Sequence, residues 1–212
     1  MKFSDFIESI PKIKKNPLPG EKAQLLLSPE ARPRFHSAFK KDSTREASVL
    51  LLMYNKNEET HIALILRSSY GGAHSGQVAM PGGKAEKEDL SQWETALRET
   101  EEEIGIPRKQ IEFIKALTSV YIPTSDFRVY PFLAKTEKID KFKLQKNEVA
   151  AVIEMPVKQL LLPENNVNLT IQISKNTSII APAFVYEDYK IWGATAMMLS
   201  ELKQLLIESV GL

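Results

Sequence analysis

The sequence predicts an α+β protein in which helices pack on a mixed β-sheet, in one domain with an N-terminal helical extension. Short apolar runs separated by polar turns indicate strands, and apolar residues at helical spacing indicate amphipathic helices. The strand-like pattern begins at about Glu46. We therefore expect the extension at residues 1–44, packed on a domain at residues 45–212.

Apart from a central acidic helix, the predicted helical segments are Phe3–Ile10, Pro156–Leu162 and Ala194–Val210. Pro11 is expected to end the first, because proline interrupts a helix, so that the basic stretch Lys12–Pro19 is a linker. The last is amphipathic, with one apolar side made of Met198, Leu202, Leu205 and Leu206. Leu25–Phe39 is ambiguous.

The predicted strands are Ala47–Tyr54, His61–Arg67, Val78–Met80, Ile111–Tyr121, Phe127–Thr136, Val149–Met155, Leu169–Ser174 and Ile179–Tyr186. The first two flank the polar turn Asn55–Thr60, so they predict a hairpin that is buried on at least one face. The last two predict a second hairpin.

Composition excludes several classes of function. The 212 residues include no cysteine, so disulfides, thiolate metal sites and cysteine nucleophiles are excluded. A net charge of +1 gives no general reason to expect nucleic acid or membrane partners. The first residues lack a secretory signal, and no apolar run reaches the roughly 20 residues of a membrane span. We expect a cytoplasmic protein that binds neither nucleic acid nor a membrane.

The stretch Pro81–Ile106 carries the chemistry. It opens with a Pro-Gly-Gly turn and enters a helix, for which Asp89 is the expected N-cap and Gly105 the end. The carboxylates of Glu99, Glu102 and Glu103 fall within a roughly 100° arc of one helix face. Leu90, Trp93, Leu97 and Ile104 are expected to face a core on the other side. Like charges so close repel one another, and a hard divalent cation turns that cost into a binding site. This predicts a metal-dependent hydrolase of a phosphate anhydride.

Arg98–Ile106, RETEEEIGI, resembles the core of the Nudix box, which reads Arg-Glu-x-x-Glu-Glu-x-Gly and then an apolar residue. Thr100 replaces the usual aliphatic residue. Eight residues separate Asp89 from Arg98, one more than in the general box. That spacing resembles the coenzyme A pyrophosphatase branch, as do Arg67-Ser68, His74, Gly76-Gln77 and the Ile-Trp-Gly-x-Thr-Ala segment from Ile191. The resemblance implies a Nudix-type α/β/α sandwich.

The resemblance also implies roles for single residues. Glu99, Glu102 and Glu103, with the backbone carbonyl of Gly82, are the implied ligands of Mg²⁺ or Mn²⁺. Arg98 is implied to orient a box carboxylate. The general base is Glu102 or Glu148, and Glu148 is alternatively a further ligand or part of a structural ion pair. The expected substrate contacts are Arg67, His74, Gln77, Gly83 and Lys84, with a carboxylate as the equally weighted alternative partner of Arg67.

The expected substrate is a small-molecule nucleotide, coenzyme A or acyl-CoA, cleaved to phosphopantetheine and adenosine 3′,5′-bisphosphate. NADH or an ADP-sugar is the alternative, since Gly72 and Met80 replace the usual Arg and Phe of that branch. An inactive Nudix-fold binding module is the alternative of another class, but it would be expected to have lost box carboxylates, and all three are present. The sequence leaves open whether residues 1–44 cap the domain or contribute to a homodimer.

Overall fold

A computed structural model describes residues 1–29, 45–68, 76–174 and 177–210. Its helices are α1 (Phe3–Lys15), α2 (Gly20–Leu25), α3 (Gln92–Ile104), α4 (Val157–Leu161) and α5 (Gly193–Val210). Its strands are β1 (Arg45–Lys56), β2 (Glu59–Arg67), β3 (Val78–Ala79), β4 (Gly82–Lys84), β5 (Glu112–Ala116), β6 (Val120–Ile122), β7 (Phe127–Lys138), β8 (Val149–Pro156), β9 (Asn166–Ser174), β10 (Thr177–Tyr186) and β11 (Tyr189–Trp192). The predicted α+β class is confirmed.

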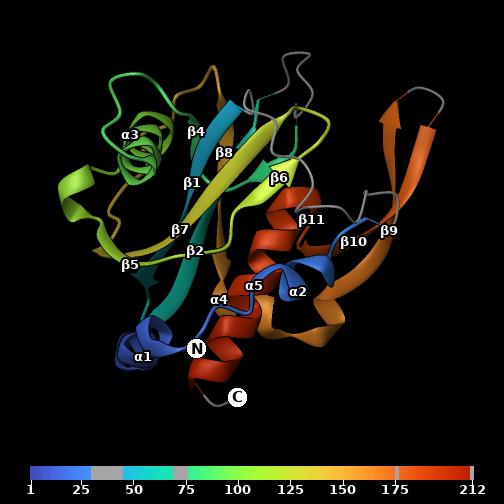
Figure 1. The fold of residues 1–212 in the computed structure, drawn as a ribbon. Helices are drawn as coiled ribbons and strands as arrows, with labels where there is room; N and C mark the ends of the chain where they lie inside the picture. The colour runs from blue at the N-terminus through green and yellow to red at the C-terminus, as the bar shows by residue number, and fades with distance from the viewer. Residues whose placement is uncertain (30–44, 69–75, 175–176, 211–212) are drawn as a thin grey trace.

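Strand β1 lies at the centre of the larger sheet. Among the described residues this sheet has eight strands. Five follow the order β3-β2-β1-β7-β5, and the other three pair with members of this row: β4 with β1, β6 with β7 and β8 with β2. The β1–β7 pair is parallel and the other pairs are antiparallel, so the sheet is mixed as predicted. Helix α3 covers one face, and α1 and α5 cover the other (Figure 1).

This arrangement explains the uninterrupted apolar run of β1. Leu50 and Leu52 belong to a core shared with α3, whereas Leu51 and Met53 belong to a core shared with α1 and α5. Neighbouring side chains of a strand point to opposite faces, so a strand that is buried on both faces shows no polar alternation. The run therefore indicates a strand in the middle layer.

The predicted hairpin is confirmed, with Lys56 paired to Glu59 around a two-residue turn. Asn57 and Glu58 both adopt positive φ, 53° and 65°, as the tight turns that suit the twist of a hairpin require. The predicted strand Ile111–Tyr121 is wrong as one element, because it divides into β5 and β6. The predicted glycine turn contains a short strand, β4, that pairs with β1.

The prediction that Pro11 ends the first helix is wrong, since α1 continues to Lys15. Ile13 beyond the proline is fully buried, and Lys115 Nζ donates to three backbone carbonyls at the helix end at 2.7–2.9 Å. Burial and capping together outweigh the single backbone hydrogen bond that Pro11 cannot donate. Phe3 and Phe6 of α1 also join the central core, while the boundary at residue 44 stays a prediction.

The C-terminal part forms a second sheet, in the order β11-β10-β9, followed by α5. The predicted hairpin is confirmed as β9–β10, and β11 was not predicted. Helix α5 is not buried along one side only, because Met197, Leu199 and Glu201 are buried as well as the predicted apolar residues. The Glu201 carboxylate accepts hydrogen bonds from Gln24 of α2 at 2.8 Å and from the Thr118 hydroxyl at 2.6 Å. Polar bonds therefore link α2 to α5.

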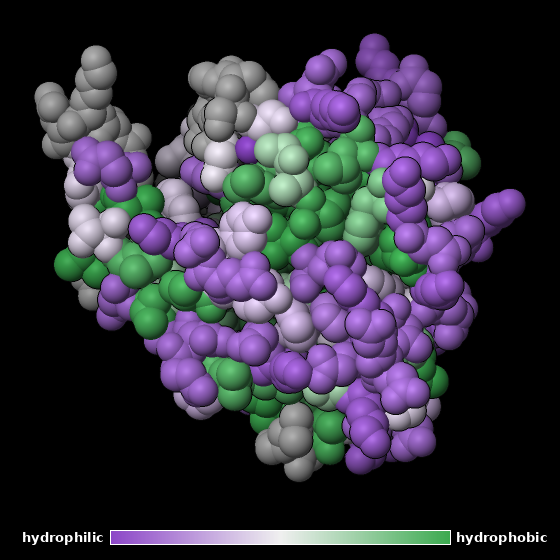
Figure 2. Space-filling model, turned by 180° about the vertical axis from the view of Figure 1, so that it is seen from behind, coloured by the Kyte–Doolittle hydropathy of each residue, from purple (hydrophilic) through white to green (hydrophobic). Residues whose placement is uncertain are grey.

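Hydrophilic side chains cover much of the face that Figure 2 shows. Seen from behind, hydrophobic side chains gather in one patch with hydrophilic side chains around much of it (Figure 2). Within the described residues, no helix combines the length and the apolar character needed to cross a bilayer.

Candidate active site

Helix α3 presents the acidic face that the sequence predicts. Its N-cap is Ser91, whose hydroxyl accepts from the Glu94 N–H at 3.2 Å, so the prediction that Asp89 caps the helix is wrong. Leu90 precedes the helix and is 93% exposed, so the prediction that it faces a core is also wrong. Thr100, in the aliphatic position of the box, is fully buried and satisfies its hydroxyl by donating to the Ala96 carbonyl at 2.7 Å.

The glycines of β4 allow the strand to lie directly against α3. A Cβ on Gly82 would lie 2.3 Å from the Ser48 carbonyl oxygen, and one on Gly83 would lie 2.5 Å from both carboxylate oxygens of Glu99. Gly82 has a φ of 151°, and its N–H donates to Glu103 Oε2 at 2.8 Å. Only glycine permits this approach, which brings the carboxylates of Glu99 and Glu103 to the same short strand.

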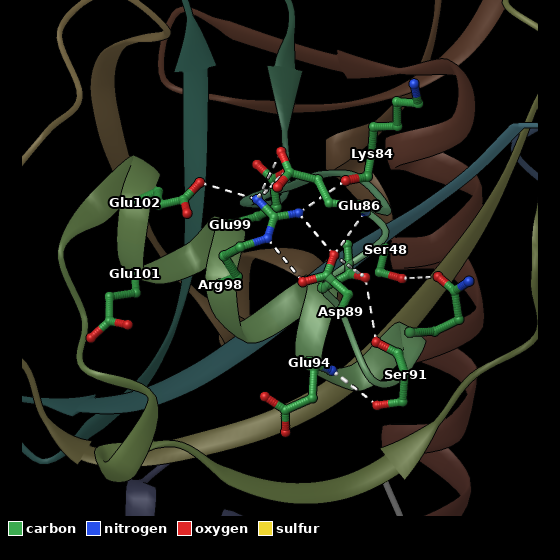
Figure 3. A network of polar contacts seen from close by, with 12 residues as sticks. Ser48, Lys84, Glu86, Asp89, Ser91, Glu94, Arg98, Glu99, Glu101 and Glu102 are labelled. Carbon is green, nitrogen blue, oxygen red and sulfur yellow. Dashed lines mark hydrogen bonds and ion pairs between the residues drawn. The ribbon is translucent and has the colours of Figure 1, made fainter.

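Arg98 is the centre of the polar network (Figure 3). Its Nε and Nη2 each donate to the Asp89 carboxylate at 3.0 Å, and Nη2 also donates to the Lys84 carbonyl at 3.0 Å. Nη1 donates to Glu99 Oε1 at 2.9 Å and to Glu102 Oε2 at 3.1 Å. The guanidinium holds the pKa of Asp89 far below its usual range. Asp89 therefore anchors Arg98, and Arg98 in turn holds two box carboxylates.

Glu103 is the most buried of the three carboxylates, at 1% exposed. Burial raises its pKa from 4.5 to about 8; the Gly82 N–H and the charge of Arg67 oppose this, and the charges of Glu99 and Glu148 add to it. Arg67 Nη1 lies 3.5 Å from Glu103 Oε1, an oxygen that accepts no hydrogen bond among the described residues. Burial also raises the pKa of Glu99, and the charges of Glu102 and Glu148 contribute to that shift.

These residues fit a divalent cation in their chemistry. Carboxylate oxygens are the ligands that Mg²⁺ and Mn²⁺ prefer, and the buried Glu103 Oε1 accepts no hydrogen bond from the residues that the structure describes, although Arg67 Nη1 lies 3.5 Å from it. Within the part of the chain that the structure describes, however, no three acidic or histidine side chains are grouped closely enough to form a metal site. The expected convergence is absent because Arg98 holds Glu99 and Glu102, whereas Gly82 holds Glu103.

Glu148 lies in the segment that follows β7 and precedes β8. The backbone N–H groups of Lys143 and Gln145 donate to the carbonyls of Ile104 and Glu103, each at 3.0 Å, so this segment caps the end of α3. Glu148 is exposed, and its charge acts on both Glu99 and Glu103. The fold thus brings Glu148 to the acidic face from a distant part of the sequence.

The other residues that were predicted to contact the substrate differ in how exposed their side chains are. Arg67 contacts a carboxylate, the alternative weighed from the sequence, and its N–H donates to the Gln77 carbonyl at 3.0 Å. Lys84 has an exposed side chain, and its backbone carbonyl accepts the hydrogen bond from Arg98 Nη2. His74, with Gly72, lies outside the described residues.

Sequence reasoning missed one network completely. The Ser48 hydroxyl donates to Gln92 Oε1 at 2.6 Å, Gln92 Nε2 donates to Glu46 Oε2 at 2.6 Å, and the Tyr130 hydroxyl donates to Glu46 Oε1 at 2.8 Å. This chain ties the first residue of α3 to β1 and β7. No local pattern marks its members, because they come from three elements that are far apart in the sequence.

Comparison with known proteins decides the family. Residues 44–175 match the family described as NUDIX domain, which is more than half of the chain. The chain belongs to the Nudix family. A relative named as an uncharacterized Nudix hydrolase NudL, from Enterobacter sp. (strain 638), is 34% identical over 158 residues, 74% of this chain and 81% of the relative. A Yersinia enterocolitica protein of the same name is 33% identical over 162 residues, 76% and 82% of the two chains.

One solved structure supports the fold independently. A MutT/nudix family protein from Enterococcus faecalis superposes with a TM-score of 0.53 at 16% identity, covering 80% of this chain and 64% of that one. The superposition shows the fold alone. Because the chain belongs to the Nudix family, it is a pyrophosphohydrolase of nucleoside diphosphate derivatives. Nudix hydrolases generally require a divalent metal ion such as Mg²⁺ or Mn²⁺.

Proposed function

We propose that this Nudix hydrolase cleaves the pyrophosphate of coenzyme A or acyl-CoA to phosphopantetheine and adenosine 3′,5′-bisphosphate. The proposal is supported by the Leu64–Gly83 stretch, which resembles that of the coenzyme A branch in sequence. The observation that carries it is that two described residues of this stretch, Arg67 and Gly82, contact one box carboxylate, Glu103. Arg67 lies 3.5 Å from it and Gly82 donates to it at 2.8 Å.

We further propose that Glu99, Glu102, Glu103 and the carbonyl of Gly82 hold Mg²⁺ or Mn²⁺. When bound, the metal polarises the phosphate oxygens and lowers the pKa of a water molecule. The charge of Arg98 offsets part of the repulsion between Glu99 and Glu102, and its bonds orient both.

A general base must then accept the proton of the attacking water. Glu148 is suited to this by its exposure beside the buried carboxylates, and Glu102 is the alternative within the box. The substrate contacts are proposed to be Arg67, His74, Gln77, Gly83 and Lys84. The exposed Lys84 ammonium provides a positive charge for a phosphate next to Gly83.

NADH or an ADP-sugar is the second candidate substrate, with the same chemistry. Gly72, in the place where the coenzyme A branch usually has an arginine, favours it. A cationic contact for the 3′-phosphate is expected only for coenzyme A, so the two candidates differ in that single interaction.

The test is a substrate panel with product identification. The purified protein is incubated with Mg²⁺ and with coenzyme A, NADH, ADP-ribose or nucleoside triphosphates, and the products are identified by mass. Phosphopantetheine and adenosine bisphosphate as the fastest-formed products support the proposal, whereas faster cleavage of NADH or ADP-ribose supports the second candidate. EDTA is expected to abolish turnover and added Mg²⁺ or Mn²⁺ to restore it, and full turnover in metal-free buffer contradicts the metal assignment.

A further inference from the structure

Arg67, the last residue of β2, and Ser68, the residue after it, contact two different segments. Arg67 Nη1 lies 3.5 Å from Glu103 Oε1. The backbone N–H of the next residue, Ser68, donates to the Glu148 carbonyl at 2.8 Å, and the Ser68 hydroxyl donates to the Lys146 carbonyl at 3.2 Å. The sequence resemblance includes the Arg-Ser pair, but the proposed function assigns no role to Ser68.

The segment before β8 forms a turn that is held from two sides. Within it, the N–H groups of Glu148 and Val149 donate to the Gln145 carbonyl at 2.9 Å and 2.8 Å. On one side, the Gln145 N–H donates to the carbonyl of Glu103 at the end of α3. On the other side, Ser68 supplies both of its donors. The position of Glu148 is therefore fixed jointly by α3 and by β2.

The register between β2 and β8 changes at the same place. Leu66 pairs with Ala151, whereas Arg67 pairs with Val149, so one residue of β8 is left without a partner. Such a bulge bends the strand and turns its neighbouring side chains in a new direction. Beyond the bulge, the backbone and hydroxyl donors of Ser68 join the end of β2 to the Glu148 turn.

The same contacts bring the turn close to the box. Its Gln145 N–H donates to the backbone carbonyl of Glu103 at 3.0 Å, and Arg67, next to Ser68, lies 3.5 Å from the Glu103 carboxylate. A shift of the turn would change the distance between Glu148 and the box carboxylates. Reactions that depend on a positioned base lose rate steeply when that base is displaced.

We propose that Ser68 is a positioning residue for hydrolysis: it holds the turn that carries Glu148, so that the Glu148 carboxylate faces the box carboxylates. Ser68 acts through Glu148 and needs no contact with substrate. The inference rests on the proposed role of Glu148 in the reaction.

The test is a double-mutant cycle on whichever of coenzyme A, NADH and ADP-ribose is cleaved fastest with Mg²⁺. Removing one neutral hydrogen bond in Ser68→Ala is expected to lower kcat by roughly three- to tenfold with KM unchanged. In the Glu148→Gln background the same substitution is expected to change kcat by less than about twofold, because the group that it positions is already disabled. Ser68→Thr keeps the hydroxyl and is expected to restore turnover, and Ser68→Val is its matched control without the hydroxyl.

A merely structural role gives a different result, because a loss of folded protein lowers kcat by the same factor in both backgrounds. Equal factors therefore overturn the inference, as does a fully active Ser68→Val. Wild-type turnover by Glu148→Gln overturns the proposed role of Glu148 itself, whereas a slow Glu148→Gln beside a fully active Ser68→Ala overturns only the role of Ser68. Ser178→Ala removes a comparable hydrogen bond, to Gln172 at 2.8 Å in the β9–β10 hairpin, and is expected to leave kcat unchanged.

Discussion

Glu103→Gln is expected to weaken the pH dependence of stability of the metal-free protein. Burial raises the pKa of Glu103 from 4.5 in the unfolded chain to about 8 in the folded state. Between these values the folded protein keeps a proton that the unfolded chain releases. The contribution to stability is therefore complete below pH 4.5 and is lost as the pH rises through 8. At about 1.4 kcal/mol per pH unit, the loss between roughly pH 5.5 and pH 8 is about 3 kcal/mol.

The assay is urea unfolding in EDTA at these two pH values, followed by circular dichroism. The wild type is expected to lose about 3 kcal/mol more than Glu103→Gln, because glutamine does not ionise and its amide oxygen still accepts from the Gly82 N–H. Adding Mg²⁺ at the higher pH is expected to restore stability to the wild type, since a cation binds the ionised carboxylate, and to restore little to the variant. Equal losses in the two proteins refute the reasoning.

Four further substitutions test the roles of single residues in catalysis and in folding. Glu102→Gln is expected to lower kcat by roughly 10²–10⁴-fold with an unchanged dichroism spectrum, because the side chain is 55% exposed and its ion pair is with Arg98; near-normal turnover contradicts it. Asp89→Asn removes the charge that Arg98 bonds twice at 3.0 Å, so urea unfolding should show a loss of roughly 2–3 kcal/mol, and kcat should fall as well; unchanged stability argues against this network. Gly193→Ala, at a φ of 65° with open space around it, should cost only the backbone strain of about 1–2 kcal/mol. Gly105→Ala should cost more, because its Cβ would lie 2.6 Å from that of Lys143, and equal unfolding free energies would contradict this comparison.

Elements defined by local pattern were predicted well. The β1–β2 hairpin and the acidic face of α3 follow from spacing within a few residues, and both are confirmed by the structure. The misplaced boundaries have distant causes. The helix at the N-terminus passes Pro11 because Ile13 finds a core and Lys115 caps the helix end.

In the candidate site, too, local roles of single residues can be predicted from the sequence, whereas contacts with distant residues cannot. Asp89 was predicted to be a helix cap, since a cap needs only neighbouring residues, but its carboxylate instead holds Arg98, nine positions later. The contacts of Ser68 with the segment at Glu148 join residues about 80 positions apart in the sequence. A periodic pattern of apolar residues predicts helices and strands but does not predict such long-range contacts.

The sequence by itself determined the family and the identity of the acidic side chains, because a box of closely spaced residues on one helix is a local pattern. Only the tertiary structure decided how each carboxylate is held: Glu103 buried against Gly82, Glu99 and Glu102 bonded to Arg98, and Glu148 brought in from the segment before β8. The physical reason is that burial and hydrogen bonding, which set the charge and orientation of a carboxylate, depend on groups supplied by distant strands.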